Sequence, residues 1–482
     1  YYLRAPSTYT GNRRNCKTST WRCNGYNGRH SSTCYRSWRK KYQSSFNGYP
    51  IRYPELISRP EHYAKLNPSE LISIARGAGG SYGDAALNQQ GEIILTGRLD
   101  RFLGFDEQQG IITVESGITL SKILELIVPR GWFLPVTPGT AEVSLGGCVA
   151  ADVHGKNHCY AGSLGQHIRG LELITAAGER LHCSSKLYPE LFWATIGGMG
   201  LTGIIGIVTL QLKRIESAYM CVQHQAAQNL EQIFAAFAEE DEWEYSVAWL
   251  DALNAPFGRG VVIKANHADL AKLSAAQQSQ AFSTQLSRCY KIPFYFPHAL
   301  LQPRLVKSFN KAYYHHLAKK NYPRVVAYPD YFYPLDRIRD WPRLYGRQGF
   351  IQYQCVLPVK SAYSVIENLL RTLDRYKHPI YLAVLKRFAN ANLAPLSFPL
   401  SGFTLALDIP IRNQKLFICL DELDAMVIDG GGRIYLAKDA RLKPEAFRAM
   451  YPRYPEWLAT KQKWDAHNRF SSSLARRLQI GV

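Results

Sequence analysis

Three glycine-rich segments constrain the fold of this 482-residue chain more than any other feature. The first, residues 76–84 (RGAGGSYGD), follows the apolar run LISIA; the second spans residues 138–158 and the third residues 197–205 (GGMGLTGII). Closely spaced glycines let backbone N–H groups turn toward one point and hold an anion such as a pyrophosphate. One such turn is weak evidence, but three segments that must closely approach something flat and anionic are hard to explain by packing alone.

The pattern of apolar residues predicts an α+β protein. From residue 46 onward, short β-like runs alternate with glycine-rich turns, and residues 120–128 have the spacing of an amphipathic helix capped by Thr119. Between about residues 218 and 430, helical stretches alternate with strands, which is typical of an antiparallel sheet with helices on one face. A Rossmann domain is not indicated, because no GxGxxG opens a helix with an acidic residue about 20 positions further on.

Residues 191–212 carry no charge and are long enough to suggest a membrane span. Five glycines, three threonines and the β-branched run 204–208 favour a buried strand–turn–strand instead. Hydrophobic residues make up 46% of the chain and charged residues 20%, which excludes a wholly disordered protein. Ten cysteines are too sparse for a disulfide scaffold.

Half of the net charge of +20 lies in residues 1–50, which contain ten basic and no acidic residues. The first acidic residue of the chain is Glu55. The ten basic residues are Arg4, Arg13, Arg14, Lys17, Arg22, Arg29, Arg36, Arg39, Lys40 and Lys41. Residues 1–45 have no helical or strand period, and we expect a disordered or foreign extension. Two alternatives are nucleic-acid binding by this basic, aromatic arm and a zinc site, although the spacing matches no common zinc finger. The zinc ligands would be Cys16, Cys23, His30 and Cys34.

In this order, the motifs RGAGGS, PGT…GG…ADVHGKNH…AGS and LFWATIGGMGLTGII resemble those of vanillyl-alcohol-oxidase-type flavoproteins, which carry a PCMH-type FAD-binding domain. The resemblance is strongest to the branch that oxidises decaprenylphosphoryl-ribose, and it continues in GFIQYQ, APLSFP, GRIYLAKD, MYPR and ARRL. It begins at about residue 46. It implies a two-subdomain FAD-binding domain (residues 46–217, with 433–482 returning to it) and an α+β substrate or cap domain with an antiparallel sheet (residues 218–432).

The resemblance also implies that FAD lies with its pyrophosphate on residues 77–81. In many relatives a histidine, after the second glycine of this loop or elsewhere nearby, bonds covalently to the flavin. Gly80 stands at that loop position here, and His154 resembles the histidine of a subfamily with non-covalent flavin, so we expect a dissociable FAD. The residues expected around the cofactor are Arg76, Gly77, Ala78, Gly79, Gly80, Ser81, Tyr82, Pro138, Gly139, Thr140, Gly146, Gly147, Ala150, Ala151, Val153, His154, Gly162, Ile204 and Tyr435.

Oxidation of a secondary alcohol by a flavin needs a group that takes the hydroxyl proton. Lys438 is the first candidate, because a desolvated lysine beside other cations loses proton affinity. It could equally stay charged and hold the substrate phosphate or the reduced flavin. Tyr82 is the second candidate, and His154 either takes part or only holds its loop. The residues expected to contact the substrate, by the same resemblance, are Lys156, Gln352, Gln354, Lys386, Ala406 and Lys438; no metal is expected.

Several positions depart from the family pattern. Ala406 stands where the family has a cysteine that faces the flavin and is the target of covalent inhibitors. Gly80 replaces an arginine, and Asp84 is followed by Ala85 and Ala86 instead of Asn-Ala. The thiol is therefore not needed for the expected chemistry, and the changes bear on the identity of the sugar more than on the type of reaction.

The expected function is FAD-dependent oxidation of the 2′-hydroxyl of a polyprenyl-phosphoryl pentose, such as decaprenylphosphoryl-β-D-ribose, to the 2′-keto sugar. This is the first half of a ribose-to-arabinose epimerisation that supplies cell-wall arabinan, and a separate NAD(P)H-dependent short-chain reductase would complete it. One alternative is an aldonolactone or other sugar oxidase on the same scaffold. Another is a basic membrane- or nucleic-acid-binding protein with an inactive flavin site.

The basic, aromatic stretch 285–325 suits a lipid-phosphate substrate and peripheral contact with an anionic membrane. A mobile, solvated loop is the alternative interpretation. We expect a cytoplasmic or peripheral membrane protein, with the periplasmic face left open, and no nucleic-acid partner.

Overall fold

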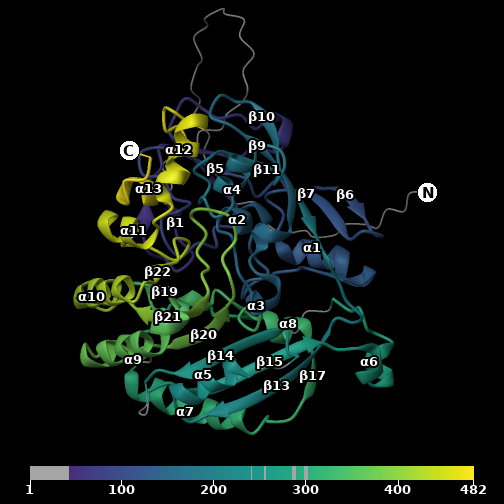
Figure 1. The fold of residues 1–482 in the computed structure, drawn as a ribbon, viewed down its shortest axis with the longest axis vertical. Coiled ribbons are helices and arrows are strands. Elements are labelled where there is room, and N and C mark those ends of the chain that lie inside the picture. Colours follow the sequence, from purple (N-terminus) through teal and green to yellow (C-terminus); the bar gives the residue numbers. More distant parts are fainter. Residues whose placement is uncertain (1–42, 240–241, 254–256, 285–288, 298–301, 482) are drawn as a thin grey trace, which may run out of the picture. The chain divides into compact units, whose positions relative to one another are not determined.

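The computed structural model describes residues 43–239, 242–253, 257–284, 289–297 and 302–481, and they form an α+β fold (Figure 1). Most of the expected N-terminal extension lies outside these residues, including the candidate zinc ligands Cys16, Cys23, His30 and Cys34, and so do parts of the stretch 285–325. Within the described ranges, no helix is long and apolar enough to cross a membrane. The uncharged residues 191–212 instead form most of helix α4 (Pro189–Thr195), a turn and strand β11 (Ile204–Gln211).

Two sheets build the first half of the described chain. A parallel three-stranded sheet has the order β3-β5-β4, and an antiparallel five-stranded sheet has the order β10-β9-β11-β7-β6. The central strand β5 (EIIL) of the parallel sheet is buried on both faces, whereas the second half of β11 alternates between buried and half-buried residues. The bounds are β3 (Leu56–Ser58), β4 (Ser73–Arg76), β5 (Glu92–Leu95), β6 (Phe102–Asp106), β7 (Ile111–Glu115), β9 (Ile168–Ile174) and β10 (Arg180–Cys183).

Short helices connect these strands. Helix α1 (Leu120–Ile127) begins at Thr119, whose side chain accepts a hydrogen bond from the amide of Lys122, and its four buried residues follow a helical period. The helix predicted at 120–128 is thus confirmed. The other elements are α2 (Leu145–Ala150), α3 (His158–Ala161), η1 (Tyr63–Lys65), η2 (Val128–Arg130), η3 (Leu164–His167) and the strand pair β8 (Trp132–Phe133) and β12 (Lys213–Arg214).

An antiparallel eight-stranded sheet dominates the second half, with the order β17-β13-β15-β14-β20-β21-β19-β22. The bounds are β13 (Tyr219–Ala227), β14 (Tyr245–Asp251), β15 (Arg259–His267), β17 (Arg324–Ala327), β19 (Phe350–Pro358), β20 (Leu382–Phe388), β21 (Gly402–Pro410) and β22 (Arg433–Ile434). Smaller elements nearby are α6 (Ala275–Gln278), α8 (Tyr328–Phe332), η4 (Leu270–Lys272), β16 (Tyr290–Lys291), β18 (Ile338–Arg339) and η6 (Trp341–Tyr345).

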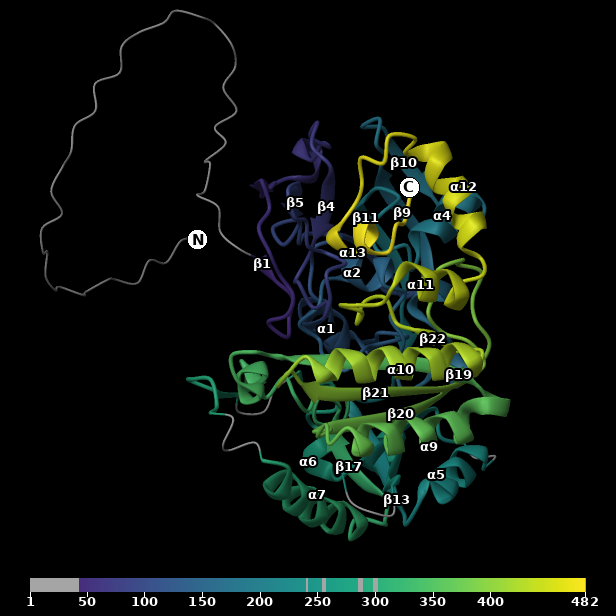
Figure 2. The same ribbon diagram turned by 90° about the vertical axis from the view of Figure 1, so that its left-hand side faces the viewer.

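Helices lie on both faces of this sheet, and not on one face as expected. Helices α5 (Leu230–Ala238), α9 (Val359–Arg375) and α10 (Lys415–Asp429) bury their apolar sides against one face (Figure 2). Helix α7 (Pro303–Ala318) covers part of the other face, where Tyr314 and Leu317 pack on Trp249 and Val261. The rest of that face meets the first half of the chain, as the contact between His154 and Gln354 shows.

The chain after β22 packs against the first half. The amide of Tyr82 donates to the carbonyl of Ala437 at 3.0 Å, and Trp457 Nε1 donates to Ala194 O at 2.9 Å. Ser73 and Phe470 form an isolated parallel bridge beside β4. The helices of this segment are α11 (Pro444–Met450), α12 (Tyr454–Trp464) and α13 (Ser473–Arg477).

The described chain begins with a strand that belongs to the fold. Strand β1 (Gln43–Ser44) pairs with β2 (Ile51–Arg52), and the Ser44 carbonyl accepts a hydrogen bond from Arg76 at 2.8 Å. Phe46 then packs on Tyr82, with ring centroids 5.2 Å apart. The expected extension, residues 1–45, therefore overlaps the folded part by three residues. Strands of two residues are too short to show an alternating pattern in the sequence, so this pair was not predicted.

Two deletions test this boundary. We expect removal of residues 1–42 to leave the melting temperature and FAD content unchanged. Removal of residues 1–47 takes away the acceptor for Arg76 and the ring on Tyr82, and should lower the melting temperature by about 5 °C. Differential scanning calorimetry of both proteins measures the difference, and equal melting temperatures would show that residues 43–47 contribute nothing.

Candidate functional site

The first glycine-rich loop, residues 77–81, leaves most of its backbone amides unused. The amide of Ala78 donates to Ser144 Oγ at 3.4 Å. Among the residues that the structure describes, the amides of Gly77, Gly79, Gly80 and Ser81 donate to no protein acceptor. Gly79 has a φ of +73°, and a Cβ on Gly77 would lie 1.9 Å from Ser144 Oγ, so only glycine fits. A run of inward-turned, unsatisfied amides is a cradle for an anion.

The second glycine-rich segment is held by Asp152. Its carboxylate accepts hydrogen bonds from the Ser163 hydroxyl (2.9 Å), the Gly165 amide (2.9 Å) and the side chains of Asn392 (2.6 Å) and Ser397 (2.5 Å). Asn392 and Ser397 belong to the loop before β21, so this buried carboxylate joins the two halves of the described chain. It thereby fixes the segment that carries His154.

His154 is neutral and has a donor to spare. Its ring lies among Phe388, Phe398 and Tyr435, and the side-chain amide of Gln354 donates to Nε2 at 2.9 Å. Burial above all, and then the nearby cations, hold its pKa well below the usual value. With Nε2 as acceptor the proton sits on Nδ1, and this buried atom has no hydrogen-bond partner among the described residues. An acceptor on a bound ligand would satisfy it.

Three lysines gather next to His154. Burial lowers the pKa of Lys386 to about 8, and burial together with Lys386 lowers that of Lys156 to about 7. Burial also lowers the pKa of Lys438 to about 7; Asp408 opposes this and Lys386 adds to it. Because Lys386 also depresses the pKa of His154, it lies near the middle of the cluster.

Lys438 and Lys156 each lie on an aromatic ring. Lys438 Nζ is 3.5 Å from the centroid of Tyr82, and Lys156 Nζ is 4.0 Å from the centroid of Tyr331, whose carbonyl also accepts a hydrogen bond from it. Both ammonium groups therefore have defined positions and keep N–H donors for a ligand.

Asp408 was not among the predicted site residues. It accepts hydrogen bonds from Gln352 (2.6 Å) and from the Tyr345 hydroxyl (3.2 Å). Burial raises its pKa to about 6, against the effects of Gln352, Lys438 and Tyr345. The two-residue period of strands was the available signal, because it puts residue 408 on the same face as the predicted Ala406.

The register of the eight-stranded sheet brings the predicted substrate residues together. Gln354 pairs with Ala406, Gln352 with Asp408, and Lys386 with Thr404, so these side chains share one face. Gln354 also donates to Thr404 Oγ1 at 3.2 Å. This polar face lies directly opposite His154.

The comparisons with known proteins agree with this geometry. Residues 67–184 match the model of the FAD binding domain family. Over 432 residues the chain is 36% identical to decaprenylphosphoryl-beta-D-ribose oxidase of Mycolicibacterium smegmatis, covering 89% of this chain and 93% of that protein. The chain belongs to this family of FAD-binding oxidases.

Two further relatives are similar over most of the chain. An uncharacterised protein of Streptomyces coelicolor is 34% identical over 75% of this chain and 100% of its own length. The L-gulonolactone oxidase of Scyliorhinus torazame is 23% identical over 86% of this chain and 93% of its own. FAD is therefore the cofactor of this family member, and the unused amides of residues 77–81 and the free Nδ1 of His154 fit it.

Several of the residues expected around FAD have partners within the protein. Arg76 donates to the carbonyls of Ser44 (2.8 Å) and Ala86 (3.3 Å), so it braces the loop from behind. In the third glycine-rich segment the amides of Gly197 and Met199 donate to Val149 O and Ala150 O. That segment supports the second one, and the side chain of Ile204 is fully buried in a cluster with Leu66, Ile94 and Phe470.

The remaining expected residues lie on the supporting segments. Tyr435 donates from its hydroxyl to Ala151 O at 2.9 Å, Gly146 donates to Ser116 O at 2.7 Å, and Gly162 has a φ of +66°. A Cβ on Gly139 would meet nothing within 4 Å, which leaves open space beside Pro138 and Thr140. Ala150 and Val153 are half-buried, and Gly147 lies near Ser144. In the described part of the chain, no group of three or more His, Cys, Asp or Glu side chains could hold a metal ion.

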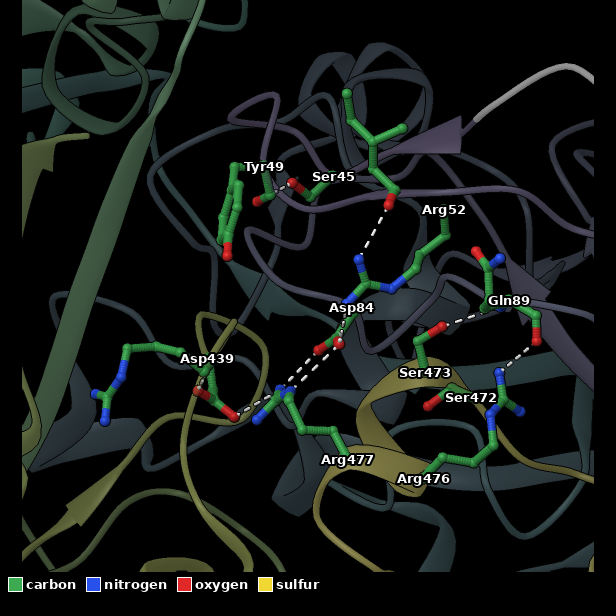
Figure 3. Close-up of polar contacts among 12 residues, drawn as sticks. Ser45, Tyr49, Arg52, Asp84, Gln89, Asp439, Ser472, Ser473, Arg476 and Arg477 are labelled. Carbon is green, nitrogen blue, oxygen red and sulfur yellow. Dashed lines mark hydrogen bonds and ion pairs between the residues drawn. The ribbon is translucent and has the colours of Figure 1, made fainter. Parts of the chain in front are cut away.

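An ion network joins Asp84 to Asp439 through Arg477 (Figure 3). Arg477 from α13 donates to Asp84 at 2.6 Å and lies 2.9 Å from Asp439, and both carboxylates are buried. Asp84 follows Tyr82 by two residues and Asp439 follows Lys438 directly. Asp439 also accepts hydrogen bonds from the amides of Arg441 and Leu442, which fixes its loop.

Removal of the Arg477 charge should be costly. We expect Arg477→Met to lower the free energy of unfolding by about 3–5 kcal/mol, because it leaves two buried carboxylates without their shared cation. Arg453→Met breaks the exposed pair with Glu456 and should change it by less than about 1 kcal/mol. Urea titrations of both variants give the two values, and similar losses would refute the special role of Arg477.

Proposed function

We propose that this protein oxidises the 2′-hydroxyl of a polyprenyl-phosphoryl pentose, such as decaprenylphosphoryl-β-D-ribose, to the 2′-ketone. The observation that carries the proposal is Lys438, a buried amine with a pKa of about 7 that lies close enough to His154 and Lys386 to interact with both electrostatically. The name of the relative that is 36% identical supports this substrate. The match to L-gulonolactone oxidase, at 23% identity, gives weaker support to a soluble sugar lactone.

FAD, when bound, supplies the chemistry by accepting a hydride from the carbinol carbon. We propose that it lies between two subdomains, one around the three-stranded sheet and one around the five-stranded sheet. The amides of residues 77–81 then hold its pyrophosphate, and Nδ1–H of His154 donates to an acceptor of the cofactor. In this scheme residues 46–217 and 433–482 form the FAD-binding domain, and residues 218–432 form the cap.

Lys438 is proposed to take the hydroxyl proton of the substrate. At neutral pH a substantial share of this amine is unprotonated, because burial and Lys386 outweigh the attraction of Asp408. Tyr82 is a weaker candidate for a base, since burial and Asp408 raise its pKa well above the usual value and keep its hydroxyl protonated. It can instead hold Lys438 through the contact with its ring.

The other polar groups are proposed to bind the substrate. Lys386 and Lys156 would hold the phosphate, whose negative charge offsets the repulsion between the cations. Gln352 and Gln354 would orient sugar hydroxyls. Ala406 opposite Gln354 brings no thiol to this face, so the proposed reaction uses none.

We also propose where the product goes. A 2′-ketone becomes the epimeric alcohol only through a second hydride donor, so a separate NAD(P)H-dependent short-chain reductase would act next. A lipid-linked substrate suggests a cytoplasmic protein or one bound peripherally to a membrane, and the face of the membrane is left open.

The flavin should dissociate on denaturation. With Gly80 in the loop and His154 held at Nε2 by Gln354, no covalent link is expected. Precipitation with acid should therefore leave the yellow colour in the supernatant, and absorbance near the flavin maximum measures it. A yellow pellet would contradict a non-covalent cofactor.

Lys438→Ala should keep FAD but reduce it with substrate at least about 100-fold more slowly. In the wild type the rate of flavin reduction should rise with pH through an apparent pKa of about 7, because the neutral amine accepts the proton. Lys443→Ala, at an exposed lysine paired with Asp421, is the matched control and should leave the rate unchanged. Anaerobic stopped-flow measures both, and a fully active Lys438→Ala variant would remove this lysine from the mechanism.

A further inference from the structure

The segment around helix α7 has an extreme charge distribution. No Asp or Glu occurs between Asp269 and Asp330. The same interval holds nine basic residues: Lys272, Arg288, Lys291, Arg304, Lys307, Lys311, Lys319, Lys320 and Arg324. A long run of charges of one sign creates a local positive potential that attracts anionic partners.

Helix α7 buries only a narrow side. Asn310, Tyr314 and Leu317 face the sheet, where Tyr314 and Leu317 pack on Trp249 and Val261. Most of the other residues of the helix are exposed. Figure 2 shows α7 on the outside of the sheet. Most of the surface of this helix is therefore available to a binding partner.

That surface divides into an apolar strip and a basic strip. Leu305, Phe309 and Tyr313 are spaced four residues apart and lie on one side of the helix, with 58%, 64% and 36% of their surface exposed. At about 100° per residue, the basic residues fall on the other side. These are Arg304, Lys307 and Lys311. An exposed apolar strip with basic residues on the opposite side is the pattern of a helix that lies in a membrane interface.

The apolar strip is continuous with the site. Phe309 stacks on Tyr313 at 5.7 Å, and Tyr313 meets Trp249 edge-on at 5.0 Å. Trp249 pairs across the sheet with Val384, and Val384 pairs with Ala406, which lies beside Gln354. Side chains of directly paired residues share a face, so a line of apolar groups runs from the outside of α7 to the polar face opposite His154.

We propose that the outer face of α7 docks on an anionic lipid bilayer, with Leu305, Phe309 and Tyr313 in the interface and the basic strip at the headgroups. This inference deepens the proposed function. It rests on that function in one respect, because a lipid-linked substrate would lie in the same bilayer. A second copy of the chain fits this face poorly, because two acid-free cationic surfaces would repel each other.

Sedimentation of the full-length holoprotein with vesicles tests the proposal. We expect strong binding to vesicles of equal parts phosphatidylcholine and phosphatidylglycerol, and weak binding to phosphatidylcholine alone. Phe309→Ser should lower the partition coefficient about tenfold, and Lys311→Gln about fivefold at low salt. Ile418→Ser, at an equally exposed residue of α10 (61%), is the matched control and should have no effect. All variants keep the basic residues 1–42, so their differences report on α7 alone.

The outcomes separate this proposal from the proposed function. Equal binding by wild type and Phe309→Ser, or equal losses in Phe309→Ser and Ile418→Ser, would overturn docking through α7. A concentration-dependent dimer that Phe309→Ser abolishes would overturn it in favour of a second copy. Reduction of FAD by a short-chain, soluble phosphoryl pentose is followed with the same proteins. If vesicles bind as expected but this substrate never reduces the flavin, the docking stands and the proposed reaction fails.

Discussion

The site depends on the ion pairs that Arg477 makes with Asp84 and Asp439. Asp84 belongs to the first glycine-rich loop and Asp439 to the chain that returns from the eight-stranded sheet. Buried carboxylates are stable only with a cation or with several donors, so the shared guanidinium stabilises the approach of the two loops. Arg52 also pairs with Asp84, and the amides of Arg441 and Leu442 also donate to Asp439. Tyr82 and Lys438 lie on these two loops. The ion pairs of Arg477 therefore help to hold Lys438 Nζ at 3.5 Å from the centroid of the Tyr82 ring.

The ion pairs of Arg477 help to position Lys438, which lies in a buried region that contains further lysines. Burial is the largest cause of the lowered pKa of Lys156, Lys386 and Lys438. The charge of Lys386 lowers the pKa of the other two further, and Asp408 opposes this at Lys438. Burial and the neighbouring positive charge lower the proton affinity of these amines, so their pKa values are about 7 to 8. An anionic ligand relieves the same repulsion, so an unfavourable arrangement of lysines favours both phosphate binding and proton transfer.

Comparison of motifs predicted roles for residues whose chemistry depends on a short stretch of sequence. For the loop at residues 77–81, His154 and Lys438 these roles stay predictions, which the unused amides, the unpartnered Nδ1 and the lowered pKa of Lys438 support. Arg76, Ile204 and the third glycine-rich segment were predicted at the cofactor and have protein partners in the structure. Their sequence signal is the same in both cases, since a glycine is required wherever backbone approaches closely, whether the neighbour is a ligand or protein.

The sequence by itself determined the α+β class, the FAD family, the capped helix after Thr119 and the glycine cradle, since these follow from side-chain periodicity and backbone freedom over a few residues. Only the tertiary structure decided that Asp408 faces Lys438, that Arg477 joins loops 355 residues apart (Asp84 and Asp439), and that α7 covers the second face of the sheet. These relations depend on strand register and on burial. Both arise from contacts between distant segments, and no local pattern of residues encodes them.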